Sequence, residues 1–184
     1  MRKTFTSSIL LLSALLFVAC SGSKSFYKKG KNLEKNGLTT EAANFYIEAL
    51  KRKRTNDDAI IALKSLGQKV LDEKYSFFYK YYSDERPKDA VYAYLDAEEF
   101  KNKVSAVGVV LSSSPYYRDY YIEARDAYVA ELYTKAASHL ENESFKDAEL
   151  ILNEIKVLDP SYKDVGALSD FAFIEPKYRQ GLRA

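Results

Sequence analysis

Residues 42–50 read AANFYIEAL, and their apolar side chains recur at the spacing of an α-helix. The positions i, i+3, i+4, i+7 and i+8 hold Ala42, Phe45, Tyr46, Ala49 and Leu50. Residues 148–158, AELILNEIKVL, form nearly the same stripe. A half-buried strand would alternate apolar and polar residues, and no stretch of the sequence sustains that alternation. The sequence therefore predicts an all-α fold.

The composition restricts the functional classes. Among 184 residues there is one cysteine, one histidine, one methionine and no tryptophan. These counts allow no internal disulfide and supply few ligands for a metal centre. The sequence contains no nucleophile elbow, phosphate-binding loop or dinucleotide fingerprint. We interpret His139, the only histidine, as a structural residue, and we expect a non-enzymatic protein with no metal or cofactor.

The N-terminus has the pattern of a secretory signal peptide. Arg2 and Lys3 precede an apolar stretch of eleven residues, 9–19. A helix that crosses the bilayer core needs about 20 residues, so this stretch has the length of a signal-peptide apolar region instead. We therefore expect residues 1–19 to be removed on export.

The only cysteine follows the apolar stretch directly. Residues 17–20, FVAC, resemble the lipobox of bacterial lipoproteins, although Phe17 stands where leucine is commoner. The resemblance implies cleavage before Cys20, a diacylglycerol thioether on its sulfur and an acyl chain on its new amine. Several acyl chains anchor a protein stably, whereas one binds only marginally. We expect residues 20–25 to form the lipidated end and a flexible tether, and residues 26–184 to form the folded domain.

The residues after the cysteine bear on localisation. Residues 21–25, SGSKS, include no acidic residue, and Ser21 follows Cys20. This is similar to lipoproteins kept on the periplasmic side of the outer membrane, with the cell surface as the alternative. We expect an outer-membrane, lipid-anchored protein that faces the periplasm.

The charge balance restricts the partners. The full chain has 28 basic and 26 acidic residues, and loss of residues 1–19 removes Arg2 and Lys3 only, so the mature charge is zero. A neutral chain argues against nucleic acid as a partner and against generalised electrostatic attraction to anionic lipid. The basic runs at 28–31 and 51–54 are interpreted as solvated helix faces.

Two segments share a pattern of small and large residues. The first contains Phe26, Gly30, Leu33, Ala42, Tyr46 and Ala49. The last contains Leu132, Ala136, His139, Ala148, Leu152, Ile155 and Pro160. Both resemble the tetratricopeptide repeat, in which small residues let two antiparallel helices approach closely. Ala90, Tyr94 and Ala97 match the second helix of a third copy.

The resemblance implies an irregular array of tetratricopeptide-like helical hairpins. The copies are spaced unevenly, so we expect inserted turns or an extra helix at residues 57–70 and 104–128. The C-terminal residues from Pro176 read as the opening of another repeat helix. A plain irregular helical bundle is the alternative fold.

Aromatic residues are unusually dense at 75–82 and 116–121. Core filling is the simpler interpretation, and we expect it for Phe77 and Phe78. In the repeat register, however, several tyrosines would fall on the inner face of a groove. A rigid, amphipathic tyrosine side chain suits a contact surface. The predicted partner-binding residues are Tyr75, Tyr79, Tyr82 and Tyr133, with Tyr27 and Lys31 at the rim.

Together these features predict a membrane-anchored adaptor or scaffold lipoprotein that holds a protein partner of an envelope complex in a helical-repeat groove. The alternative is a glycan- or peptide-binding accessory lipoprotein of an outer-membrane uptake system.

Overall fold

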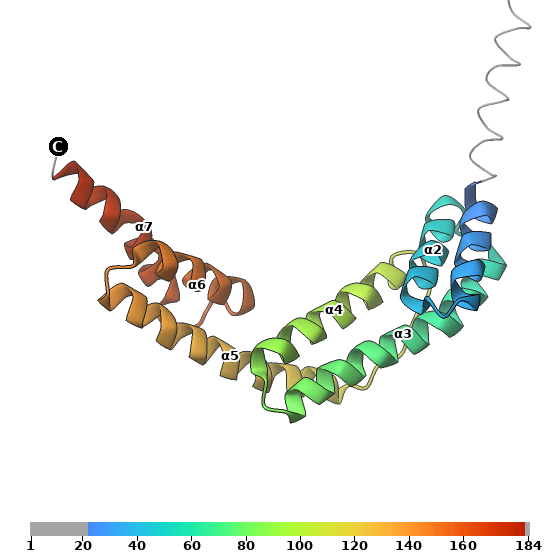
Figure 1. Ribbon diagram of the computed structural model, residues 1–184, viewed down its shortest axis with the longest axis horizontal. Helices are drawn as coiled ribbons and strands as arrows, with labels where there is room; N and C mark the ends of the chain where they lie inside the picture. The colour runs from blue at the N-terminus through green and yellow to red at the C-terminus, as the bar shows by residue number, and fades with distance from the viewer. Residues whose placement is uncertain (1–21, 183–184) are drawn as a thin grey trace, which may run out of the picture. The chain divides into compact units, whose positions relative to one another are not determined.

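The computed structural model describes residues 22–182, and within this range every regular element is a helix (Figure 1). The all-α prediction is confirmed for these residues. The predicted signal peptide, residues 1–19, and Cys20 lie outside the described residues. Helical residues 22–35 are followed by α2 (Thr39–Arg52), α3 (Asp57–Ser83), α4 (Pro87–Ser105), α5 (Tyr116–Glu141), α6 (Phe145–Leu158) and α7 (Val165–Gly181).

The chain divides into two compact units. Unit 1 takes Met1–Phe78 and Ala93–Pro115, and unit 2 takes Tyr79–Tyr92 and Tyr116–Ala184. The boundaries fall inside α3 and α4, so each of these helices contributes residues to both units.

The first helical hairpin of unit 1 packs through a glycine. Gly30, in the first helix, lies against α2, where a Cβ atom at Gly30 would stand 2.6 Å from Cε1 of Tyr46 and 3.1 Å from the carbonyl oxygen of Ala42. Ala42 and Tyr46 are fully buried. The turn between the helices contains Gly37 at φ 77°, a left-handed conformation that glycine adopts without steric cost. The two helices lie side by side in Figure 1.

The start of this hairpin differs from the expected tether. Residues 22–25 are helical, and Ser23 is only 1% exposed. The Ser23 hydroxyl donates to the carbonyl oxygen of Ala49 at 2.9 Å and accepts from the Asn56 amide at 2.8 Å. The prediction of a flexible tether is therefore wrong for residues 22–25, because the serine hydroxyl has two partners in the folded unit.

The first predicted insertion is part of the long helix α3. Residues 57–70 form no separate helix but the first half of α3, which begins after Asn56. The Asn56 side-chain oxygen accepts from the Ala59 amide at 3.3 Å and so caps the helix. After α4, residues 106–115 return along α3 without regular structure. The Gln68 side chain pairs with both backbone groups of Ser112 at 2.9 Å, which holds this return segment in place.

Unit 2 is built on the sequence α5, α6, α7, in which α6 packs against both neighbours (Figure 1). Its core includes the predicted small residues Ala136 and Ala148, both fully buried. One prediction here is wrong: Pro176 does not open a new helix but lies inside α7. Proline lacks an N–H group, so it removes one hydrogen bond of the helix without ending it here.

Candidate functional site

The predicted partner-binding residues fall in both units. Tyr27, Lys31 and Tyr75 belong to unit 1, whereas Tyr79, Tyr82 and Tyr133 belong to unit 2. Their surroundings differ enough that each group is described separately below.

Tyr79 and Tyr82 come together with a third tyrosine that the groove prediction did not include. Their ring centroids are 6.2 Å apart, and those of Tyr79 and Tyr120 are 5.7 Å apart. Tyr82 stacks on Tyr120 with 4.9 Å between centroids. Tyr79 is 47% exposed, and Tyr82 and Tyr120 are half-buried, so the group presents part of its aromatic surface to solvent. We call Tyr79, Tyr82 and Tyr120 the tyrosine cluster.

An acidic carboxylate fixes one ring of the tyrosine cluster. The Tyr82 hydroxyl donates to the carboxylate of Glu123, one turn beyond Tyr120 on α5. This hydrogen bond raises the pKa of the Tyr82 phenol to about 12. The phenol therefore stays protonated well above physiological pH and remains the donor in this hydrogen bond.

A hollow of about 290 Å³ adjoins the tyrosine cluster within unit 2. Its charged lining consists of three glutamates and one arginine, and the arginine is already paired with Asp89 at 2.7 Å. The hollow therefore suits a ligand that carries positive charge or hydrogen-bond donors. It is lined by Tyr82, Glu85, Arg86, Pro87, Glu123, Ala124, Ala127 and Glu131.

Tyr133 is half-buried and belongs to a different contact. Its hydroxyl donates to Asp164 at 2.6 Å, and its ring meets the Tyr162 ring edge-on at 5.6 Å. The Lys163 ammonium lies 4.3 Å from the same ring. These contacts join α5 to the turn before α7, so Tyr133 serves first to hold that turn.

Tyr75 does not offer a contact surface. It is 2% exposed, its ring packs on Tyr94 at 6.1 Å, and its hydroxyl donates to Glu98. The prediction for Tyr75 as a partner-binding residue therefore disagrees with its burial. Tyr75 and Phe78 are three residues apart on one helix, so both face α4.

The two phenylalanines of α3 have opposite environments. Phe78 is fully buried, as predicted, but Phe77 is 51% exposed, so its predicted place in the core is wrong. Successive residues of a helix point about 100° apart, and one of two neighbours must turn away from a narrow packing face.

Tyr27 lines a second hollow, of about 730 Å³, within unit 1. The Tyr27 ring packs on the Tyr46 ring, with 5.6 Å between the ring centroids. Lys31 lies one turn further along the same helix and is exposed. We call this second hollow the N-terminal hollow; it is lined by Ser23, Lys24, Tyr27, Lys28, Lys53, Thr55, Asn56, Asp57 and Asp58.

The sequence contains a partial signal for two residues that the sequence analysis did not identify. Ser23 precedes Gly30 by seven residues, which places both on one helix face, but the low-complexity run SGSKS suggested a tether. Tyr120 lies in the second aromatic segment, and only the folding of unit 2 brings it to Tyr79.

Comparison of the chain with models of protein families, with curated proteins and with solved structures found no match. Between residues 22 and 182, no group of three or more His, Cys, Asp or Glu side chains is arranged to hold a metal ion. Nor does any helix in this range have the length and apolar character needed to cross a membrane. The function is therefore argued from the geometry of the two units.

Proposed function

We propose that this chain is a non-enzymatic adaptor lipoprotein, exported by residues 1–19, anchored through a lipidated Cys20 and holding a protein partner. The observation that carries the proposal is the tyrosine cluster, with its exposed Tyr79, beside the acidic hollow in unit 2. Aromatic rings that are already positioned lose little conformational freedom on binding, and such residues dominate binding energy at interfaces.

The tetratricopeptide-like character is part of the same proposal. Gly30 precedes the buried Ala42 by twelve residues, and Ala136 precedes the buried Ala148 by the same interval. In each hairpin a small residue on the first helix is buried, as is the alanine on the second. The shared spacing supports a common hairpin design in the two units.

The segment of the partner that binds should complement the lining of the hollow in unit 2. Glutamate carboxylates favour lysine or arginine side chains, and exposed tyrosine rings also attract cations through their faces. A basic segment of another envelope protein fits these requirements. We place the chain at the outer membrane, facing the periplasm, with the cell surface as the alternative.

Capture of the partner from detergent-solubilised outer membrane tests the binding surface. Tyr79→Ala should weaken capture by more than about 1 kcal/mol and leave helicity and melting almost unchanged. The matched control is Phe77→Ala, which removes a similarly exposed ring two residues earlier on α3 and should leave capture unchanged. If the parent and Tyr79→Ala captured the partner equally well, Tyr79 would not belong to the binding surface, and the proposed surface would lose its central residue.

Fractionation tests the anchor independently. Cys20→Ser should release the protein into the soluble fraction or leave it with its signal peptide attached. A variant that is still processed and still membrane-bound would contradict lipidation at Cys20.

The second candidate function is a glycan- or peptide-binding accessory lipoprotein of an uptake system. The tyrosine cluster favours it because sugar rings also stack on exposed aromatic side chains. Saturable binding of an oligosaccharide by the isolated protein would support this function over the adaptor.

A further inference from the structure

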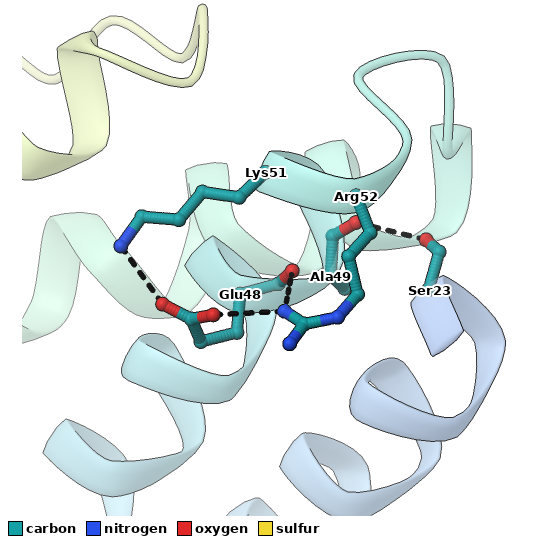
Figure 2. A network of polar contacts seen from close by, with 5 residues as sticks. All are labelled: Ser23, Glu48, Ala49, Lys51 and Arg52. Atoms are coloured by element: carbon teal, nitrogen blue, oxygen red, sulfur yellow. Dashed lines mark hydrogen bonds and ion pairs between the residues drawn. The ribbon is translucent and has the colours of Figure 1, made fainter. Parts of the chain in front are cut away.

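The described part of unit 1 starts close in sequence to the proposed lipid anchor. Ser23 lies three residues after Cys20 and is already locked between Ala49 and Asn56 (Figure 2 shows its bond to Ala49). A fully extended chain covers at most about 3.6 Å per residue, so Ser23 can lie no more than about 11 Å from the anchored residue. If Cys20 carries acyl chains, this end of unit 1 is held at the level of the lipid headgroups.

The lysines at this end form no ion pair with the acidic residues that the structure describes. No ion pair between residues 22 and 182 includes Lys24, Lys28 or Lys53, although all three line the N-terminal hollow. Their ammonium groups are therefore available to an anion from outside. Lysine binds phosphate as a compact point charge.

Neighbouring basic residues show the opposite arrangement. Lys51 and Arg52 are both paired with Glu48 at 2.8 Å, as Figure 2 shows. The Arg52 guanidinium also lies 3.7 Å from the centre of the Phe26 ring. Three lysines without an ion pair among the described residues, Lys24, Lys28 and Lys53, therefore lie together at the N-terminal hollow.

The hollow also contains negative charge. Asp57 and Asp58 lie in the first turn of α3, where they complement the helix dipole, and both residues line the same hollow. A ligand that matches this lining carries a phosphate for the lysines and an ammonium group for the aspartates.

We propose that the N-terminal hollow is the membrane-facing end of unit 1 and binds the phosphoethanolamine headgroup of phosphatidylethanolamine. The inference rests on the proposed lipidation of Cys20, which supplies the closeness to the membrane. Lys24, Lys28 and Lys53 hold the phosphate, and Asp57 and Asp58 face the ammonium group. The headgroup contacts orient the anchored unit, whereas the acyl chains alone would only tether it.

The test uses the lipidated mature chain, from Cys20 onward, in vesicles of a neutral galactolipid, with or without phosphatidylethanolamine. Because Cys20 is the only cysteine and its sulfur is acylated, one new cysteine can carry an environment-sensitive fluorophore. Ser25→Cys reports from beside the hollow, and Asn36→Cys reports from the far end of the same hairpin. The two positions are about 16 Å apart along the helix.

Addition of phosphatidylethanolamine should shift the emission at position 25 to the blue and leave that at position 36 nearly unchanged. Substitution of Lys24, Lys28 and Lys53 by Gln should abolish this shift. The matched control replaces three other exposed lysines of unit 1 (Lys35, Lys64 and Lys69) by Gln, and should keep the shift. Equal circular dichroism of all variants confirms that they are folded.

The outcomes separate the two proposals. Flotation of the parent with the vesicles and the mass of acylated Cys20 report on the anchor alone, so their failure contradicts the proposed lipoprotein. A floating, acylated parent whose position 25 gives no phosphatidylethanolamine-dependent shift overturns the headgroup site. An identical shift in the Lys24, Lys28 and Lys53 variant overturns it as well.

Discussion

The close approach of the first hairpin gives the sharpest prediction, because one methyl group tests it. Gly30→Ala should destabilise the protein, although alanine normally favours a helix. The new Cβ would lie 2.6 Å from Cε1 and 2.7 Å from Cδ1 of the Tyr46 ring. Carbon atoms pack best at about 3.5–4.0 Å, so the ring would have to move by about 1 Å.

The ring has little freedom to move. Tyr46 is fully buried, and its hydroxyl donates to Glu34 at 2.5 Å. Overpacking of such a site costs about 1–3 kcal/mol. The gain in helix propensity from glycine to alanine offsets about 1 kcal/mol. We take the upper part of the overpacking range, which leaves a net loss of about 1–2 kcal/mol and lowers Tm by about 2–8 °C.

Thermal and urea unfolding, followed by circular dichroism, measure this difference. Gly67→Ala is the matched control, since Gly67 is also a buried helical glycine of unit 1. A Cβ at Gly67 would meet Leu63 Cδ1 at 3.4 Å and Leu111 Cδ1 at 3.6 Å. That variant should be as stable as the parent or more stable by up to about 1 kcal/mol. If Gly30→Ala were equally well tolerated, the hairpin could not be packed as closely as described.

Two further predictions concern unit 2. Ala148→Leu should overpack the fully buried contact of α6 and cost about 1–3 kcal/mol in urea unfolding, and an unchanged midpoint would place Ala148 at the surface. Burial and the hydrogen bond to Glu154 raise the pKa of Tyr92 to about 12, above its ordinary 10.0. The neutral phenol is thus favoured in the folded state, so its stabilisation is complete below pH 10 and is lost as the pH rises through 12. Alkaline titration followed by circular dichroism should show this loss, and Tyr92→Phe should reduce it; unfolding that began well below pH 10 would contradict this assignment.

Part of the fold was predictable because helical periodicity was clear in some segments. In residues 42–50 and 148–158, apolar residues recur at the helical spacing i, i+3, i+4 and i+7, and this stripe indicates the buried side of each helix. The buried state of Ala42, Tyr46 and Ala148 agrees with that reading.

The aromatic segment of α3 has no such apolar stripe. Residues 75–82 read YSFFYKYY, with aromatic rings on every side of the helix, so no stripe marks the packing face. The position of α4 decides that Tyr75 and Phe78 are buried and Phe77 is exposed. The candidate site depends even more on tertiary structure, because Tyr79 and Tyr120 are 41 residues apart in the sequence.

The carboxylate of Glu154 links three helical segments of unit 2. Its Oε1 atom accepts hydroxyl hydrogen bonds from Tyr92 of α4 and Tyr128 of α5, both at 2.6 Å, while Glu154 itself belongs to α6. If α6 separates from its neighbours, both phenols lose their acceptor at once, and the part-buried Tyr128 hydroxyl carries a desolvation penalty. Local openings of these segments are therefore coupled, and this part of unit 2 should fluctuate as one cooperative foldon.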